Sequence, residues 1–592
     1  TCPRMGARYF LLIFMCKSDT IEKNGEDELQ MENRCFLLDG GMGTMLASRI
    51  DMPATLPESV NITHPDILTD IHRAYIRAGA DYIYANTFGV NGHKLRGSDY
   101  TVDQLVGAAL RNAKAAAAAE GRDNVKVALD LGPLGEMLEP MGTLTFDEAY
   151  ELFREAVVAG EKHGADLIVF ETFSDLLELK AGLLAAREHT SLPVFCTMTF
   201  TESGKTFAGV SVSSAAVTLT ALGASAVGIN CSLGPVQIYP MIQEMARYTD
   251  LPLIVKANAG LPKDGAAVYD IGPEVFAEMA PRFIEAGAAY IGGCCGTTPA
   301  YISAIRGAVE GLPLPPARKV QSAVCSARET VALDRVRIVG EQINPSGRDA
   351  FADALRAGMT DSVLDLVFAQ ENADMLDVNV SLPELDEPAV MRETVRLIQS
   401  VCHKPLQIDS ANPAAMEAGL RACNGRPVLN SVTGEDAKLS IILPLAKKYG
   451  AVVVGLTMDE AGLPDTAERR LEIARKIVER AEAFGLRRRD VVIDCLSLPV
   501  AVYPDQAAET LKAVALVKRE LGVRTMLGIS NISFGMPDRE RINAAFLTMA
   551  IAAGLDLPIL NPESGQVTDA LDAALLLCGA EQGMLRFLRR DE

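Results

Sequence analysis

Short apolar runs rich in β-branched residues recur along the chain, and each is followed by a stretch with apolar residues at helical spacing. In the first half, eight runs begin near residues 36, 82, 125, 167, 193, 226, 252 and 289. Their hydrophobicity is continuous rather than alternating, which is typical of strands buried on both faces of a helix-covered parallel sheet. Eight strand–helix units predict a closed (β/α)8 barrel.

The pattern restarts after the proline-rich stretch GLPLPPARKV, with eight further runs near residues 336, 375, 405, 426, 451, 491, 524 and 557. We therefore predict an α/β fold of two (β/α)8 TIM barrels in tandem, residues 36–312 and 333–592, with a linker over 313–332. A pair of open, doubly wound sheets would also alternate buried strands with helices, but the count of eight in each half favours barrels. Residues 1–35 are expected to form an N-terminal extension.

Composition narrows the classes of partner. A formal net charge of -21 over 592 residues argues against nucleic acid, which demands clustered Lys and Arg. The apolar run YFLLIFMC at residues 9–16 is far shorter than the roughly 20 residues of a spanning helix, so no membrane association is expected. Twelve cysteines without compact spacing favour a reducing, cytoplasmic compartment over a disulfide framework.

Three cysteines stand where strands of the first barrel are expected to end. Cys231 closes GINC on the sixth strand, and Cys294 and Cys295 close the eighth in YIGGCCGT. Because the C-terminal strand ends form the active face of such a barrel, the three thiols should converge. Three protein ligands with an open fourth position describe a catalytic zinc, which would deprotonate a thiol that enters its coordination sphere. The alternatives are small residues of a glycine-rich turn, or a vicinal disulfide.

Other strand ends in this half offer groups that could hold an amino acid. Asp39 is followed by Gly40 and Gly41, whose backbone N–H groups could approach a carboxylate. Glu171 closes the fourth strand, and an acidic pair is a reasonable partner for an α-ammonium group. Glycine after a strand is more often simply part of a tight turn.

The motifs DGGMGTM, NTF, ETF, GINC and GGCCGT, in this order, resemble the homocysteine methyltransferase family over roughly residues 36–312. The resemblance implies a zinc-dependent barrel that activates homocysteine. It implies zinc ligation and catalysis by Cys231, Cys294 and Cys295. It also implies that the amino acid lies near Asp39, Gly40, Gly41 and Glu171.

Carboxylates and amides, rather than histidines, follow the strands of the second half. They are Asp377, Asn379, Asp409, Asn430, Asp494 and Asn531. Any single one would more often cap a helix. Together at one barrel mouth they suit a heterocycle with an amidine-like N–H edge, such as a pterin, because a carboxylate can accept two parallel N–H bonds.

The motifs VGEQINPSG, QIDS, LNS and GISNISFG resemble the pterin-binding methyltetrahydrofolate methyltransferases, with dihydropteroate synthases as more distant relatives. The resemblance implies pterin contacts from Asp409, Asn430 and Asp494, and a catalytic Asn531 near the methylated N5. Further candidates for binding methyltetrahydrofolate are Asp377, Asn379, Glu341, Asn344, Arg348, Ser530 and Arg539. Two residues depart from the pattern of that family: Gln342 stands where Arg is common, and Cys495 stands where Pro is common. These departures affect the expected geometry of the local loops.

A homocysteine barrel followed by a methyltetrahydrofolate barrel resembles the N-terminal half of cobalamin-dependent methionine synthases. This implies a methyltransferase that moves a methyl group from 5-methyltetrahydrofolate, through a corrinoid, to zinc-activated homocysteine, giving methionine. The sequence contains no D-x-H-x-x-G signature, so cobalamin is expected from a separate domain or protein. The alternatives are a corrinoid-independent homocysteine S-methyltransferase with a regulatory or folate-reductase second barrel, and a non-catalytic folate-binding module.

Overall fold

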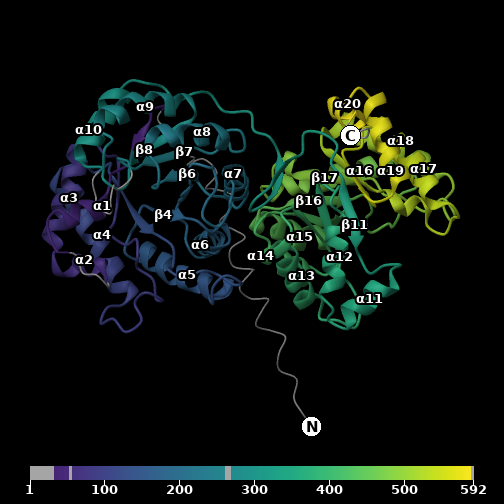
Figure 1. The fold of residues 1–592 in the computed structure, drawn as a ribbon, viewed down its shortest axis with the longest axis horizontal. Helices are drawn as coiled ribbons and strands as arrows, with labels where there is room; N and C mark the ends of the chain where they lie inside the picture. The colour runs from purple at the N-terminus through teal and green to yellow at the C-terminus, as the bar shows by residue number, and fades with distance from the viewer. Residues whose placement is uncertain (1–32, 52–55, 261–268, 589–592) are drawn as a thin grey trace, which may run out of the picture.

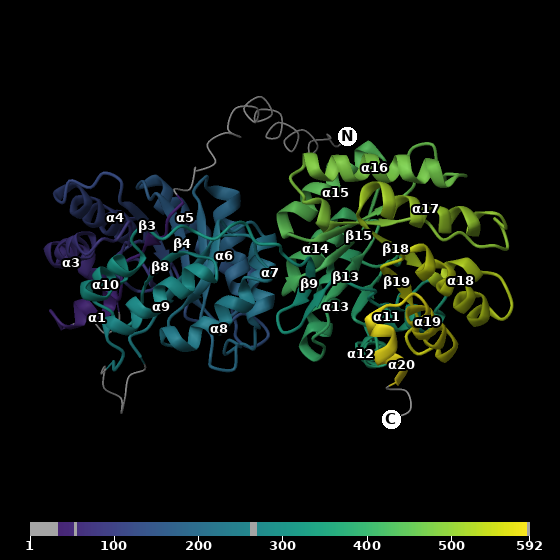
Figure 2. The ribbon, with the colours of Figure 1, turned by 90° about the horizontal axis from the view of Figure 1, so that it is seen from above.

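The computed structural model describes residues 33–51, 56–260 and 269–588, which form two barrels lying side by side (Figures 1 and 2). Of the expected N-terminal extension, residues 1–32 lie outside the described residues. Within the described ranges, no helix combines the length and the apolar character needed to cross a membrane.

The first barrel is a sheet of eight parallel strands, as predicted. They are β1 (Phe36–Leu37), β2 (Tyr82–Tyr84), β3 (Lys126–Leu131), β4 (Leu167–Phe173), β5 (Val194–Met198), β6 (Ala226–Asn230), β7 (Leu253–Ala257) and β8 (Ala288–Gly293). The first and last positions of the sheet meet, because Leu38 bridges Tyr82 and the Asp81 N–H donates to the Leu37 carbonyl at 2.7 Å. Four aromatic rings, of Phe36, Tyr82, Phe195 and Tyr290, fill the interior near the N-terminal strand ends. The interior at this end is therefore apolar, and the predicted site residues lie at the opposite strand ends.

Helices surround this barrel and begin where the sequence signals them. They are α1 (Met42–Ala47), α2 (Val60–Thr63), α3 (Pro65–Arg77), α4 (Val102–Ala119), α5 (Phe146–Lys162), α6 (Leu176–His189), α7 (Val212–Ala221), α8 (Pro235–Met245), α9 (Pro273–Glu285) and α10 (Pro299–Val309), with a 3₁₀ turn η1 (Pro57–Ser59). Thr101 and Thr145 begin α4 and α5 with reciprocal capping boxes, in which Gln104 and Glu148 return the hydrogen bond. Capping satisfies N–H groups that a helix start leaves unpaired.

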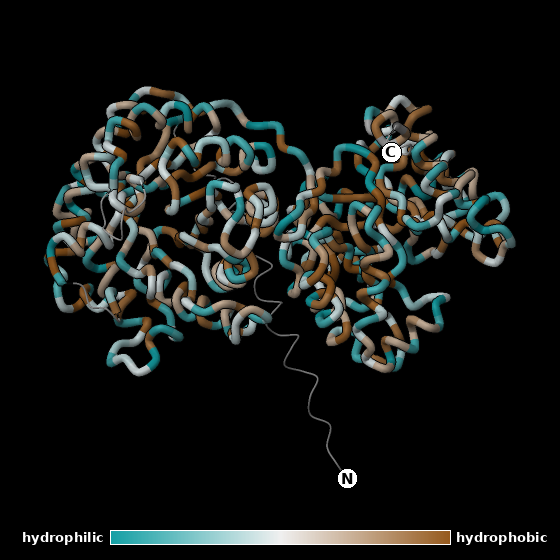
Figure 3. Tube along the Cα trace, viewed as in Figure 1, coloured by the Kyte–Doolittle hydropathy of each residue, from teal (hydrophilic) through white to brown (hydrophobic). Residues whose placement is uncertain are grey.

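The second barrel is a closed ring of eight parallel strands, which also confirms the prediction. They are β11 (Val339–Ile343), β12 (Met375–Val378), β13 (Leu406–Asp409), β15 (Val428–Thr433), β16 (Val452–Leu456), β17 (Val491–Asp494), β18 (Arg524–Gly528) and β19 (Leu557–Leu560). Aliphatic side chains from most of these strands fill its interior, and Figure 3 shows hydrophobic residues gathered toward the middle of this barrel.

The helices of the second barrel continue to the end of the described chain. They are α11 (Asp349–Arg356), α12 (Asp361–Phe368), α13 (Glu387–Val401), α14 (Pro413–Ala422), α15 (Asp436–Tyr449), α16 (Ala467–Ala483), α17 (Gln506–Leu521), α18 (Arg539–Ala553), α19 (Gly565–Leu577) and α20 (Glu581–Leu588), with 3₁₀ turns η2 (Arg488–Asp490) and η3 (Ile529–Ser533). The turn η3 lies between β18 and α18 and carries residues of the site.

The segment between the barrels is more structured than a proline-rich linker would suggest. Strands β9 (Ala323–Ser326) and β10 (Thr330–Ala332) pair antiparallel, and β14 (Gly425–Arg426) of the second barrel joins the other edge of β9. The small sheet touches both barrels, since Cys325 contacts Thr218 of α7 at 3.2 Å while Val324 belongs to the second barrel's core. Pattern reasoning missed β9 and β10 because they lie in the stretch that was interpreted as a linker.

A buried lysine joins the two barrels directly. Lys180, on α6 of the first barrel, is 1% exposed, and its ammonium donates to the carbonyls of Leu420 and Cys423 at 2.7 Å each. These carbonyls lie at the C-terminal end of α14, where a helix leaves acceptors unpaired and favours positive charge. Burial lowers the pKa of Lys180 to about 8. The hydrogen bonds to the carbonyls therefore offset the cost of removing the ammonium from water.

We expect Lys180→Met to destabilise the protein, because the variant keeps the apolar stem but leaves buried carbonyls without a donor. The expected loss is about 2–3 kcal/mol in the free energy of unfolding. The chain contains no tryptophan, so urea unfolding should be followed by far-UV circular dichroism. Lys162→Met is the matched control, since that side chain is 61% exposed and pairs with exposed Asp103. Equal unfolding midpoints for the two variants would refute the interfacial role.

Candidate functional site

The three cysteines of the first barrel meet at its C-terminal mouth. Cys231 follows β6, while Cys294 and Cys295 follow β8, and their sulfur atoms all lie within 4.8 Å of one another. The sulfurs of Cys231 and Cys295 are 3.7 Å apart. Bonds of about 2.3 Å to one tetrahedral zinc would place sulfurs about 3.8 Å apart, so the cluster fits that ion. The predicted convergence is therefore present.

Backbone geometry explains how adjacent cysteines reach one point. Cys231 has a left-handed backbone with φ of 60°, which turns the chain sharply at the end of β6. After β8, a Cβ at Gly293 would lie 2.2 Å from the Thr297 hydroxyl, and Gly296 has φ of 80°. Only glycine fits the first position, and it is favoured at the second. The GGCCG sequence thus forms an irregular turn that directs both thiols inward.

Hydrogen bonding favours a thiolate in this cluster. The thiols of Cys294 and Cys295 donate hydrogen bonds to the Cys231 sulfur and lower the pKa of its thiol. Asn258 fixes the turn from the neighbouring strand end, accepting the Cys295 N–H at 3.1 Å. A cluster that holds negative charge on sulfur is suited to a soft or borderline cation.

The acidic pair predicted for an amino acid already has a cationic partner. The Lys256 ammonium lies 3.5 Å from Asp39 and 3.3 Å from Glu171, and it sits 3.5 Å from the centre of the Tyr84 ring. Asp39 also accepts the Tyr84 N–H at 2.7 Å, and burial raises its pKa to about 6. Asp39 is almost fully buried, whereas Glu171 is the more accessible of the two carboxylates. Glu171 is therefore the better placed to meet a substrate ammonium.

Pattern reasoning did not identify Lys256 or Asp130 as members of this site. Asp130, near the end of β3, is buried, and its Oδ1 has no hydrogen-bond partner among the described residues. The signal for both was a charged residue inside an otherwise apolar strand, as in IVKANAG and VALDLG. A charged residue is rarely buried unless it forms an ion pair or hydrogen bonds, or belongs to a functional site.

Gly40 and Gly41 lie beside the cysteine turn rather than in open space. The Gly41 N–H donates to the Thr297 hydroxyl at 3.2 Å, and a Cβ at Gly41 would lie 2.8 Å from the Cys294 carbonyl. The two glycines therefore bring the β1–α1 turn against the sulfur cluster. Their proposed contact with a substrate carboxylate remains a prediction.

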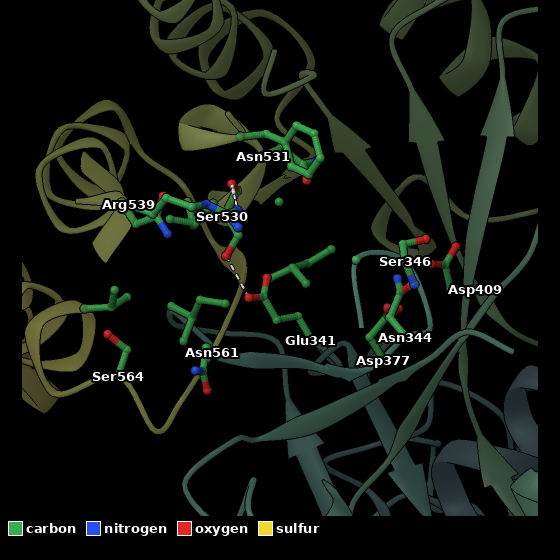
Figure 4. Close-up of a pocket in the computed structure, with 18 of the residues that line it drawn as sticks. Glu341, Asn344, Ser346, Asp377, Asp409, Ser530, Asn531, Arg539, Asn561 and Ser564 are labelled. Carbon is green, nitrogen blue, oxygen red and sulfur yellow. Dashed lines mark hydrogen bonds between the residues drawn. The ribbon is translucent and has the colours of Figure 1, made fainter. Parts of the chain in front are cut away.

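The mouth of the second barrel contains a cavity of about 690 Å³ (Figure 4). Most of the predicted polar residues line it: Glu341, Asn344, Arg348, Asp377, Asp409, Asn430, Asp494, Ser530, Asn531 and Arg539. Asn379 is not part of the lining but donates to Asp409 Oδ2 at 2.9 Å. The volume is within the range typical of small-molecule sites.

Three carboxylates, those of buried Asp377 and of half-buried Asp409 and Asp494, give this cavity its chemical character. Asp377 accepts from Gln407 at 2.7 Å, and Asp494 Oδ1 accepts the Leu496 N–H at 2.8 Å. Burial raises the pKa of Asp494 to about 7 and that of Asp409 to about 6. The pKa of Asp377 is raised further, by burial and by the charge of Asp409. Poorly hydrated carboxylates bind strongly to N–H groups that can replace water.

The opposite wall of the cavity is held together by hydrogen bonds to backbone and side chains. The Ser530 hydroxyl donates to Glu341 Oε1 at 2.7 Å, and Arg539 donates to the Ser530 carbonyl at 2.9 Å (Figure 4). Arg348 donates to the carbonyls of Glu341 and Gln342 at 3.0 and 2.9 Å. Both arginines thus use some of their N–H groups to hold the loops in position.

Two departures from the family pattern leave the acceptors in place. Gln342 donates to Asn561 at 2.6 Å and to Glu563 at 2.8 Å, and Cys495 is fully buried behind the site. Asp494 still faces the cavity. Asn561, which follows β19, also lines the cavity, and the rule that strand ends carry polar site residues would have identified it. Asn543, on α18, and Ser564, which precedes α19, also line the cavity, but neither follows a strand, so this rule does not identify them.

Comparison with known proteins gives two family matches. Residues 36–309 match the model "Homocysteine S-methyltransferase", and residues 340–561 match "Pterin binding enzyme". Methionine synthase of Mycobacterium tuberculosis is 32% identical over 570 residues, covering 90% of this chain and 48% of that protein. Methionine synthase of Mycobacterium leprae is 31% identical over 578 residues, covering 90% and 47%. The chain thus spans about half the length of these relatives.

Among solved structures, the oxidised form of the homocysteine methyltransferase MmuM from Escherichia coli is similar to part of the chain. The identity is 25% and the TM-score 0.41, and the match covers 46% of this chain and 95% of that one.

Proposed function

From the matches to the homocysteine S-methyltransferase and pterin-binding families and the resemblance to the N-terminal half of methionine synthase, we propose a methyl-transfer function for this chain. It takes part in transfer of a methyl group from 5-methyltetrahydrofolate, bound in the second barrel, to homocysteine, bound in the first. The product is methionine. The sulfur cluster at the mouth of the first barrel is the observation that carries the proposal.

In the first barrel, Cys231, Cys294 and Cys295 would hold zinc and leave room for a substrate thiol. The ion would supply Lewis acidity, which keeps that thiol deprotonated at neutral pH. Glu171 would orient the α-ammonium group, while Lys256 compensates the charge of the neighbouring carboxylates. This arrangement selects a thiol that carries an amino group at a fixed distance.

In the second barrel, Asp494 and Asp409 would accept N–H bonds from the pterin edge, and Asn430 would complete its polar contacts. Asn531, on η3 beside β18, would contact N5. The hydrogen bond between Ser530 and Glu341 steadies the adjoining wall. These side chains bind and orient the methyl donor.

The cavity residues supply binding groups rather than a methyl acceptor. Among the described residues that line it there is no cysteine, lysine or histidine. The N5 amine of the folate is a poor leaving group, so removal of its methyl group needs a very strong nucleophile. We propose that a corrinoid from a separate domain or protein carries the methyl group between the barrels, because such cofactors perform chemistry that side chains cannot.

The proposal is tested by supplying the zinc-loaded protein with homocysteine and 5-methyltetrahydrofolate, with and without reduced cobalamin. Methionine should form only when the corrinoid is present. Methionine formed from a sulfonium or betaine donor without corrinoid would favour a direct homocysteine S-methyltransferase. Binding of both substrates without turnover in any arm would favour a non-catalytic folate-binding module.

A further inference from the structure

A single buried asparagine connects the two parts of the first barrel's site. Asn230 is the last residue of β6 and is 0% exposed. We propose that Asn230 is a positioning residue that aligns the Glu171 turn with the sulfur cluster, so that amino group and thiol of one substrate are held together. The inference deepens the proposed function and rests on it.

The amide of Asn230 uses its hydrogen-bonding capacity on both sides. Its Oδ1 accepts the Thr172 N–H at 2.8 Å and the Thr197 hydroxyl at 2.9 Å. Its Nδ2 donates to the Thr172 hydroxyl at 2.7 Å and lies 3.9 Å from the Cys294 sulfur. A primary amide offers two acceptor sites and two donor hydrogens, and here each has a partner. The side chain is thus fixed in one orientation.

Thr172 is the residue that most needs this support. Its φ is 68°, a left-handed conformation that is strained for a β-branched residue. The register between β4 and β5 shifts between Phe170 and Phe173, so the chain bulges at this point. Asn230 bonds both the backbone and the hydroxyl of Thr172. It thereby fixes the direction of the adjoining Glu171, whose carboxylate meets Lys256 at 3.3 Å.

The same side chain reaches the sulfur cluster by two routes. Asn230 directly precedes Cys231 in the chain, and its Nδ2 faces the Cys294 sulfur from within the barrel. Once zinc is bound, Cys294 would be a thiolate, and an N–H directed at it would fix the position of the sulfur and offset part of its charge. Such outer partners of metal ligands commonly affect metal affinity about 10- to 100-fold. Asn230 therefore acts on both ends of the substrate without touching it.

Two near-isosteric variants distinguish the contact with sulfur from the contact with Thr172, because Asn230→Asp affects both and Thr172→Val affects only the second. Asn230→Asp keeps an acceptor for the Thr172 N–H and the Thr197 hydroxyl but removes the amide donor that faces both Cys294 and the Thr172 hydroxyl. Thr172→Val removes the hydroxyl that Asn230 binds and leaves the contact with sulfur intact. Zinc affinity is measured by chelator competition, homocysteine binding by calorimetry, and the cobalt(II)-substituted protein by its thiolate charge-transfer absorption. Binding of 5-methyltetrahydrofolate in the second barrel reports that the fold is preserved.

Asn230→Asp should weaken zinc binding about 10- to 100-fold and shift the cobalt(II) absorption, and it should also weaken homocysteine binding. Thr172→Val should weaken homocysteine binding about tenfold and leave zinc affinity within about twofold. Unchanged zinc affinity in a folded Asn230→Asp variant would overturn the inference about Asn230 but not the proposed function. If that variant does not fold, unchanged homocysteine binding in Thr172→Val overturns it. Failure of the unsubstituted protein to bind zinc would overturn the proposed function as well.

Discussion

Replacing Cys294 with alanine should abolish homocysteine binding and methionine formation while leaving 5-methyltetrahydrofolate binding intact. Cys294 is one of three sulfurs that lie within 4.8 Å of one another, and two remaining ligands would not hold a catalytic zinc. The expected loss of zinc affinity exceeds the roughly 10- to 100-fold that follows loss of an outer partner. Calorimetric titration with each substrate in turn measures both halves of the prediction.

Cys196→Ala is the matched control for this variant. Cys196 is a fully buried cysteine on β5 of the same barrel but is not in the sulfur cluster. Its removal should cost some stability through lost packing and leave homocysteine binding unchanged. If both substrates were lost together in Cys294→Ala, the two sites would not be independent. Homocysteine binding retained by Cys294→Ala would remove the cluster from the mechanism.

Asp494→Asn should have the reciprocal effect. The variant keeps the shape of the side chain but loses the carboxylate that would accept two N–H bonds from the pterin. Charge-assisted bonds of this kind contribute about 3 kcal/mol, so affinity for 5-methyltetrahydrofolate should fall roughly 100-fold. Zinc and homocysteine binding should not change. Asp365→Asn, an exposed substitution on α12 of the same barrel, serves as the control.

The pH dependence of folate binding identifies the carboxylate. Burial raises the pKa of Asp494 to about 7, while hydrogen bonding to the Leu496 N–H and the charge of Arg470 oppose the rise. The ionised form binds, so affinity should increase as pH rises through 7 and level off above it. In Asp494→Asn the step near 7 should be lost, while the step near 6 from Asp409 should remain. An identical pH profile in the two proteins would exclude Asp494 as the titrating group.

Continuous apolar runs made the barrels predictable, because a strand buried on both faces shows the same signature wherever it occurs. The strand-end rule then located Cys231, Cys294 and Asp494 without coordinates, since a barrel brings all C-terminal strand ends to one face. The hydrophobic pattern of the sequence predicts where a residue lies along its strand. It does not predict which residue lies opposite across the barrel.

The rest of the site depends on contacts between residues far apart in the chain. Lys256 meets Asp39 and Glu171 because three strands converge, and no local signal records that distance. Lys180 binds the end of α14, 240 residues later in the chain, through barrel packing alone. Charged residues inside apolar runs were nonetheless visible in the sequence. They mark where such long-range partners should be sought.

The most direct test of the central claim is elemental analysis of the reduced, purified protein. We expect one zinc per chain in the unsubstituted protein and in Cys196→Ala, and none in Cys294→Ala. The reason is that Cys231, Cys294 and Cys295 would together hold the ion. A reduced protein that carries no zinc, and takes up none when the ion is supplied, would contradict the account of homocysteine activation.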